Sequence, residues 1–216
     1  MKEPVKRRYS SPQREAQAVE TRRAVLVAAR ELFEERGYAA VGVGEVATRA
    51  GVNLDTVYRS VGRKPQLLLA VIDQILGSSD QVLPAEQRDY VIAIRTATTA
   101  EEKLRTYADA LGTLMPRLAP LFAALREAAS ADPECAALDR QIDDRRAANM
   151  RLLAADLRTT GQVRPELDDD RVADLIWSTN SSQWHDLVRS RGWTAGEYAD
   201  ALCDLWCRVL LSRSEL

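Results

Sequence analysis

Residues 43–60 read VGEVATRAGVNLDTVYRS, and this stretch indicates how the first third of the chain folds. Two short runs with helical spacing stand on either side of Gly51, which supplies the positive-φ position that a tight turn needs. Val52 is an apolar plug between the runs, and Asn53 is a good N-cap for the second run, Leu54 to Ser60. This pattern is typical of a helix-turn-helix, although an ordinary helical corner can carry the same turn.

Helical spacing continues on both sides of this stretch, and strand alternation is weak everywhere. Upstream, apolar residues at intervals of three and four predict a helix from about Val19 to Arg36, which Gly37 ends. Downstream, Lys64 and Pro65 begin a longer helix, because proline suits a first helical turn. The sequence therefore predicts an all-α fold of about nine helices, with a three-helix helix-turn-helix domain followed by a larger helical domain.

The larger domain begins with the least regular part of the chain, residues 78–98, where we expect a loop and a short helix near Tyr90. A capping box at Thr99 starts the next helix, and two prolines at positions 116 and 120 are expected to break it. Later helices are expected over residues 133–160, 168–191 and 194–212. The expected segments are a flexible basic arm (1–18), the helix-turn-helix domain (19–64) and a C-terminal domain (65–216).

The charge is distributed unevenly along the chain. The net charge is −2, but residues 1–64 hold 13 Lys and Arg against 8 Asp and Glu, whereas residues 65–216 hold 17 against 24. A basic N-terminal third beside an acidic remainder suggests that one end binds a polyanion. Chance produces such dipoles too, so the charge does not decide the function alone.

Few residues in the chain are suited to catalysis or metal binding. One histidine, His185, and three cysteines are too few and too scattered for a zinc site, and no nucleophile–base pair or phosphate loop is visible. We expect no enzyme activity, no metal and no cofactor. Cys203 and Cys207 share a helix face, which allows a redox switch but fits buried small apolar residues better. Without a long apolar run or a signal peptide, we expect a cytoplasmic protein with no membrane contact.

Residues 22–68, taken as a set, resemble the TetR family of bacterial regulators. The matching positions are Arg23, Ala28-Ala29, Leu32-Phe33, Gly37-Tyr38, Val46-Ala47, Ala50-Gly51-Val52, Thr56-Val57-Tyr58, Lys64 and Leu67-Leu68. Residues 172–177, 186–189 and 191–194 also look like one subgroup of that family. The resemblance implies a transcriptional repressor that binds a palindromic operator in double-stranded DNA as a homodimer. It also implies that a small-molecule effector, bound in the C-terminal domain, releases the operator.

The resemblance assigns DNA contacts to the second short helix and its flanks. Thr56, Tyr58 and Arg59 match recognition-helix positions, and Lys64 matches a position that clamps the DNA backbone. Tyr58 is expected to donate its hydroxyl to a phosphate, and Arg59 to reach a phosphate or a guanine. The full candidate set is Arg23, Gly42, Asn53, Leu54, Asp55, Thr56, Tyr58, Arg59 and Lys64.

Five positions, in three places along the chain, depart from the family pattern and put the operator preference in doubt. Val41 and Gly42 replace the usual Thr or Ser before the second helix, so a hydroxyl contact to phosphate is lost. Leu54 and Asp55 replace a lysine or small residue followed by glycine, and Val61 replaces an aromatic residue. The Asp55 carboxylate repels phosphates but is able to accept a hydrogen bond from a cytosine amino group.

The expected effector site consists of polar residues on otherwise apolar helix faces. Trp177, Asn180 and Trp184 share one face in residues 168–191, and Arg146 and Asn149 share one in residues 133–160. Such a face suits a small-molecule cavity, and it equally fits an ordinary core in which one polar residue fixes the helix register. The full candidate set is Tyr107, Phe122, Arg146, Asn149, Trp177, Asn180, Ser181 and Trp184.

Dimerisation has a physical reason beside the resemblance. One recognition helix makes too few contacts for tight specific binding, and two helices in one particle multiply the affinity. The last two expected helices, about 168–191 and 194–212, are rich in large apolar residues and are the expected dimer interface. The alternative is a helical protein–protein interaction module that does not bind DNA.

Overall fold

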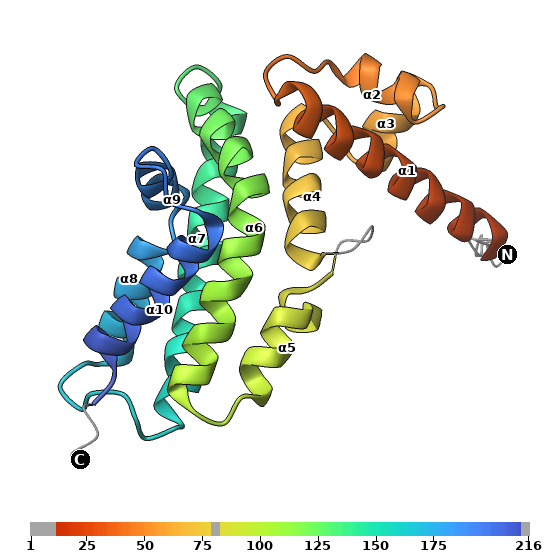
Figure 1. Ribbon diagram of the computed structural model, residues 1–216. Coiled ribbons are helices and arrows are strands. Elements are labelled where there is room, and N and C mark those ends of the chain that lie inside the picture. Colours follow the sequence, from red (N-terminus) through yellow and green to blue (C-terminus); the bar gives the residue numbers. More distant parts are fainter. Residues whose placement is uncertain (1–11, 79–82, 213–216) are drawn as a thin grey trace, which may run out of the picture.

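The computed structural model describes residues 12–78 and 83–212, and these residues form ten α-helices and one 3-10 helix (Figure 1). A single bridge between Val163 and Leu211 is the only β-pairing within them. The prediction of an all-α fold is confirmed. In chain order the elements are α1 (Pro12–Arg36), α2 (Val43–Arg49), α3 (Leu54–Ser60), α4 (Lys64–Gly77), η1 (Ala85–Gln87), α5 (Asp89–Thr96), α6 (Ala100–Ala129), α7 (Pro133–Arg158), α8 (Asp169–Thr179), α9 (Ser182–Arg189) and α10 (Ala195–Leu210).

Helices α1, α2 and α3 pack around a small apolar core of their own. Val25, Val46 and Val57 come from three different helices, and each is fully buried. The turn between α2 and α3 has the predicted form: Gly51 has a φ of 68°, and the Asn53 side chain accepts the amide hydrogen of Thr56. Figure 1 shows these three helices at one end of the molecule, away from α8 and α10.

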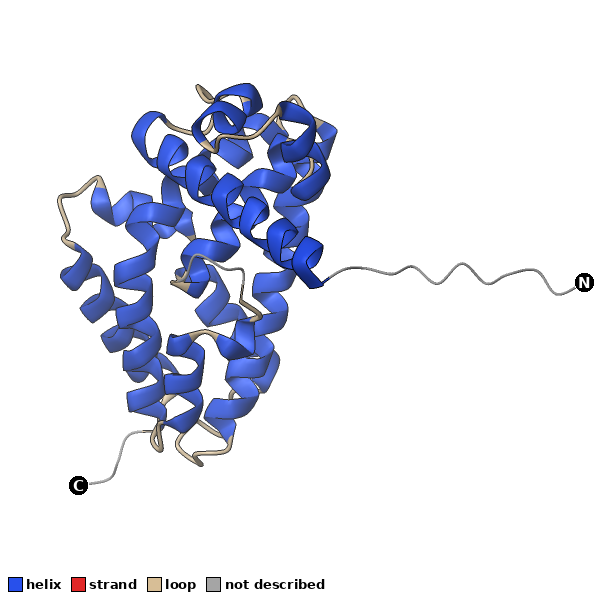
Figure 2. Ribbon diagram, turned by 90° about the vertical axis from the view of Figure 1, so that its right-hand side faces the viewer, coloured by secondary structure: helices blue, strands red, loops and turns tan. Residues whose placement is uncertain are grey.

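The C-terminal part is built around α6, a 30-residue helix that is about 45 Å long. Helices α5, α7, α9 and α10 all pack against it (Figures 1 and 2). The approach of α10 is closest at Gly112, where an added Cβ would lie 3.0 Å from the Ala195 carbonyl oxygen. Tyr198 and Trp206 of α10 are both almost completely buried in this interface. Among the described residues, no helix is both long and apolar enough to cross a bilayer.

Helix α1 begins earlier than expected. The flexible arm was predicted to extend through residue 18, but residues 12–18 are helical, so the prediction is wrong for them. Pro12 is tolerated because it stands in the first turn, and residues 13–18 are Gln, Arg, Glu, Ala, Gln and Ala, which all favour helix. Their side chains are exposed, so local propensity rather than packing explains the helix there. The rest of the predicted arm, residues 1–11, lies outside the described residues.

Two further predictions of helix boundaries are corrected by the structure. Pro116 and Pro120 do not break α6, because an apolar stripe that includes Leu114, Leu118 and Leu121 is buried on both sides of them. Burial of this stripe outweighs the local cost of each proline, about 3 kcal/mol. The expected helix over residues 168–191 is instead two helices, α8 and α9, which separate at the buried Asn180. The short helix expected near Tyr90 is α5, and the 3-10 helix η1 precedes it in what was expected to be loop.

Replacing Gly112 tests the close packing of α6 on α10. Gly112→Val places a side chain against the Ala195 carbonyl oxygen and the Ala199 Cβ, 3.0 and 3.1 Å from the added Cβ. Overpacking of this kind should lower the free energy of unfolding by about 1–3 kcal/mol, measured by urea denaturation at one protein concentration. Gly196→Ala is the control, because the nearest atom to its Cβ is 4.0 Å away. Equal stability of Gly112→Val and wild type would contradict the packing described here.

Candidate nucleic-acid interface and ligand cavity

The exposed face of α3 is the candidate DNA-reading surface. Val57 points into the domain and is fully buried, whereas Leu54 and Tyr58 on the other side are 42% and 46% exposed. Asp55 and Arg59 are also exposed, and Arg59 lies within 3.5 Å of the Thr56 hydroxyl. The face therefore presents one phenol, one cation and one carboxylate around an apolar residue, a mixture suited to base edges as well as phosphates.

The Asn53 side chain is committed to the helix rather than free for DNA. Its Oδ1 accepts hydrogen bonds from the Thr56 amide and the Thr56 hydroxyl, at 2.8 and 2.7 Å. Arg22 of α1 donates to the carbonyl oxygen of Ser60, the last residue of α3. These bonds fix both ends of α3, and Arg22 was not among the predicted site residues.

Gly42 caps α2, but its amide group already has a partner. The Gly42 N–H donates to the Glu45 carboxylate at 2.8 Å, and Arg36 holds the same carboxylate from the other side. The hydrogen bond from Gly42 and the ion pair with Arg36 keep the pKa of Glu45 below its usual value. The Glu45 carboxylate therefore occupies the start of α2, and a DNA phosphate would have to displace it to reach the Gly42 amide. Arg23, the remaining candidate, lies on α1 and pairs with Glu20 at 3.0 Å.

Lys64 joins the start of α4 to the loop after α1. Its Nζ donates to the Ala39 carbonyl oxygen at 3.3 Å and lies 4.3 Å from the centroid of the Tyr38 ring. Partial burial lowers the pKa of the ammonium group below its usual value. An ammonium group has three donors, so donors remain for a phosphate while the side chain stays in this position.

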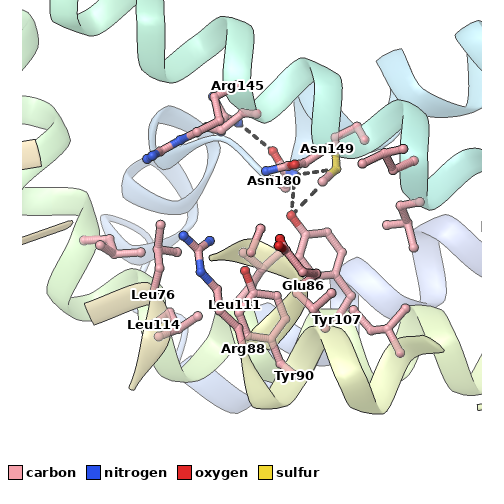
Figure 3. A pocket seen from close by; sticks show the side chains of 18 of the residues that line it. Leu76, Glu86, Arg88, Tyr90, Tyr107, Leu111, Leu114, Arg145, Asn149 and Asn180 are labelled. Carbon is pink, nitrogen blue, oxygen red and sulfur yellow. Dashed lines mark hydrogen bonds between the residues drawn. The ribbon is translucent and has the colours of Figure 1, made fainter. Parts of the chain in front are cut away.

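A cavity of about 230 Å³ lies between α4, α5, α6 and α7 (Figure 3). Most of its wall is apolar, and Leu76, Leu111 and Leu114 contribute to it from α4 and α6. Polar side chains reach it from three directions: Arg88 and Tyr90 from the start of α5, Arg145 from α7, and Asn180 from the α8–α9 junction. A mainly apolar cavity with a few converging polar groups is the usual form of a small-molecule site.

Asn180 organises the polar end of the cavity. Its Nδ2 donates to the Tyr107 hydroxyl at 2.8 Å, and its Oδ1 accepts from Arg146 at 2.6 Å. Arg146 also donates to the Trp177 carbonyl oxygen and pairs with Asp143. Tyr107 is fully buried, and this burial raises the pKa of its phenol. The network satisfies Asn180 and fixes the point at which the last helices bend.

Five of the eight predicted effector residues line this cavity, and three do not. The five are Tyr107, Phe122, Arg146, Asn149 and Asn180. Trp177 lies under the Arg146 guanidinium, 5.5 Å from ring centroid to Cζ, and Ser181 caps α9 by accepting from the Trp184 amide. The Trp184 ring packs against Trp193 and Tyr198. Because the chain bends after Asn180, the stripe assumed to be continuous from residue 177 to residue 184 turns away from the cavity.

Sequence reasoning missed the part of the cavity that α4 and α5 provide. Leu76, Glu86, Arg88 and Tyr90 all line it, and Arg145 does so from α7. Glu86, Arg88 and Tyr90 fall in the stretch of residues 78–98 that has no regular pattern. The signal in the sequence was an arginine and a tyrosine beside a short apolar run, which by itself is too common to indicate a site.

The remaining titratable residues singled out in the sequence lie in the C-terminal core. His185 is buried, lies 3.3 Å from the Asp186 carboxylate and packs edge-on against Tyr198. Cys203 and Cys207 are free thiols whose sulfur atoms are 3.9 Å apart. No group of three potential metal ligands occurs among the described residues.

Comparison with known proteins relates the N-terminal segment of the chain to a protein family. Residues 25–71 match the model of the bacterial regulatory proteins of the tetR family. The HTH-type transcriptional activator FasR of Mycolicibacterium smegmatis is 35% identical over 91 residues, which are 42% of this chain and 38% of FasR. The HTH-type transcriptional repressor Rv3405c of Mycobacterium tuberculosis is 41% identical over 63 residues, which are 29% of this chain and 34% of the repressor. The chain thus spans little more than a third of the length of these curated relatives.

The fold similarity extends over nearly the whole chain. The transcriptional regulator FadR of Bacillus subtilis, solved in complex with stearoyl-CoA, superposes with a TM-score of 0.65 at 19% identity. This superposition covers 85% of this chain and 96% of the FadR chain. The match of the N-terminal segment and the similarity of the fold agree with each other. The N-terminal segment, residues 25–71, is therefore similar to the DNA-binding domain of the tetR family of bacterial regulatory proteins.

Proposed function

We propose that this chain is a DNA-binding transcriptional regulator that acts as a homodimer and responds to a small molecule in the cavity. One observation carries the proposal: α4 connects the DNA-reading surface to the cavity. Lys64, its first residue, follows α3 closely, and Ile72 and Leu76 further along the helix line the cavity. A ligand that displaces α4 therefore changes the position of α3.

The DNA-reading surface supports binding in the major groove. Tyr58 and Arg59 are exposed on α3 and are able to donate to phosphates or to guanine, and Asp55 is able to accept from a cytosine amino group. Lys64 adds a cation at the adjoining helix start. Within this proposal Asn53 and Gly42 act through the backbone geometry of the helix starts, because their polar groups already have protein partners.

The proposed dimer forms through residues 168–191 and 194–212. Leu187 on α9 is 63% exposed and Val209 on α10 is 37% exposed, and Leu175 and Leu205 are partly buried. Apolar side chains that stay exposed in one protomer are suited to the core of an isologous interface. Two recognition helices in one particle read a palindromic operator at a fixed spacing.

An effector regulates this particle only if it binds one arrangement of the two recognition helices more tightly than the other. The cavity wall includes α4, so the cavity shape and the position of α3 change together. We propose that the occupied cavity favours the arrangement that does not fit the operator, which gives repression in the absence of effector. The alternative, an interaction module without DNA binding, predicts no affinity for duplex DNA at any salt concentration.

Binding to a random DNA duplex tests the DNA-binding function directly. Fluorescence anisotropy at low salt should detect binding, and the affinity should fall steeply and linearly on a logarithmic salt scale. Tyr58→Ala should weaken binding, because an exposed phosphate donor is removed. Ile92→Ala is a matched control on α5, where an apolar side chain is 47% exposed far from α3. Absence of salt-dependent binding by the wild-type protein would exclude the regulator and favour the interaction module.

Lys64→Ala tests the backbone clamp. It should weaken binding to all DNA sequences alike and reduce the slope of log affinity against log salt by about one unit, because one phosphate contact is lost. Lys64→Met keeps an apolar chain over Tyr38 and separates the lost charge from lost packing. Arg151→Ala, on α7 and paired with Asp170, should leave the slope unchanged. A slope equal to wild type in both Lys64 variants would remove this residue from the interface.

Val209→Asp tests the dimer interface. A carboxylate at this position stays solvated in a monomer but is costly inside an apolar interface, so the variant should be monomeric by light scattering. Specific operator affinity should fall with it, since each monomer carries a single recognition helix. Ile92→Asp, at an equally exposed apolar position on α5, should remain dimeric. A dimeric Val209→Asp protein would place the interface elsewhere.

A further inference from the structure

Arg88 is a buried cation that lacks a full set of partners. The residue is 6% exposed, and its Nε has no hydrogen-bond partner. Among the described residues, only the Asp73 carboxylate lies within ion-pair distance, with 3.6 Å between Nη2 and Oδ1. A guanidinium group has five N–H donors, and burial without acceptors is unfavourable. An arginine in this state indicates a binding site for an anion.

Asp73 does not neutralise Arg88, because it is already engaged by a second arginine. Arg145 of α7 approaches both of its carboxylate oxygens, at 2.9 Å from Nη2 to Oδ1 and 3.2 Å from Nη1 to Oδ2. Two guanidinium groups therefore share one carboxylate, which leaves one positive charge in excess. Figure 3 shows Arg88 and Arg145 reaching toward each other from opposite walls of the cavity.

The other arginine at this end, Arg146, is fully used by the protein. It pairs with Asp143 and donates to Asn180 and to the Trp177 carbonyl oxygen. Glu86 and Arg95 also line the cavity, but among the described residues no ion pair joins either of them to Arg88, Arg145 or Asp73. The cluster of two arginines and one carboxylate, bordered by Leu76 and Leu114, therefore keeps its excess positive charge. A ligand for this site needs one anionic group at the arginines and an apolar body along the remaining wall.

The cavity volume limits the size of the apolar part of the ligand. An apolar cavity of about 150 Å³ is known to bind benzene, so about 230 Å³ suits a ligand on the order of ten non-hydrogen atoms. We propose that the cavity binds a small amphiphilic carboxylate, with Arg88 as its main anchor and Arg145 as the second. Binding of the carboxylate does not depend on the proposed function. Only the statement that this ligand is the effector rests on it.

Through Asp73, a bound anion is able to affect α4 and hence the DNA-binding end of the molecule. Asp73 is on α4, whereas Arg88 precedes α5 and Arg145 is on α7, so this ion-pair cluster ties α4 to the wall opposite. A ligand carboxylate competes with Asp73 for the same guanidinium groups. Each bond that it forms with Arg88 or Arg145 weakens the attachment of α4, whose first residue, Lys64, follows the end of α3 after three residues.

Titration calorimetry on the full chain tests the site with three eight-carbon probes. Octanoate should bind at least about tenfold more tightly than octan-1-ol, and octylammonium should bind more weakly than either, because only octanoate forms charge-assisted bonds with arginine. Equal affinity for octanoate and octan-1-ol would overturn the proposal. Failure of octanoate to bind at all would overturn it as well.

Two variants locate the anchor. Arg88→Met keeps an unbranched apolar side chain but removes the guanidinium group, and it should reduce octanoate affinity about tenfold or more, with octan-1-ol affinity unchanged. Arg117→Met is the control, since Arg117 pairs with Glu34 and does not line the cavity. Asp73→Asn removes the competing carboxylate and should raise octanoate affinity several-fold, which a purely structural role of Asp73 would not do. Unchanged octanoate affinity in Arg88→Met would contradict the assignment.

A DNA-binding measurement on the same samples separates this inference from the proposed function. If octanoate binds through Arg88 and lowers the affinity for DNA, both stand. If it binds and leaves DNA affinity unchanged, the carboxylate site stands and its role as effector site is wrong. If the wild-type chain binds no DNA, the calorimetric comparison of the three probes still decides the site by itself.

Discussion

The structure depends on one constraint: α4 is packed at both ends at once. Leu67 and Leu68 near its start are fully buried, and Ile72 and Ile75 further along are buried as well. Its first part packs against α1 and its later part against α6. Because packed interiors are dense and change between discrete arrangements, a displacement at one end of such a helix is transmitted rather than absorbed. The cavity and the recognition helix are therefore parts of one mechanical unit.

Local signals in the sequence predict the N-terminal domain well. Gly51 and Asn53 determine the turn and the start of α3 through backbone conformation and one side-chain bond, and neither depends on the rest of the molecule. The same holds for the capping box at Thr99. The continuity of α6 through Pro116 and Pro120 could not be predicted, because it results from burial by helices remote in sequence. Asn180 ends α8 for a similar reason: its partners Tyr107 and Arg146 lie on two other helices.

The candidate site residues also fall into two groups: those that local sequence predicts and those that depend on tertiary packing. Exposure of Tyr58 and Arg59 follows from the helix-turn-helix pattern, so sequence alone was sufficient to select them. The hydrogen bond from the Gly42 amide to Glu45 was not predicted, although Glu45 stands three residues later in the spacing of a capping box. Arg88 could not be selected at all. Arg88 is singled out because its buried Nε has no hydrogen-bond partner. That absence can be recognised only when the positions of α4, α5 and α7 around Arg88 are known.

The ion-pair cluster at Asp73 also makes the ligand affinity of the cavity depend on DNA binding. Coupling between two binding sites is reciprocal, so any factor by which a ligand in the cavity weakens DNA binding is the factor by which DNA weakens ligand binding. Under the proposed function, the arrangement of α4 that DNA selects is the one in which Asp73 holds Arg145 most firmly and competes best for Arg88. Two arginines around one carboxylate suit this role. Their excess positive charge attracts an anionic ligand, and the shared carboxylate competes with that ligand, which raises the ligand concentration needed for binding. A pair with no excess charge would bind an anion more weakly, and an arginine pair without the carboxylate would bind it more tightly and respond at a lower ligand concentration.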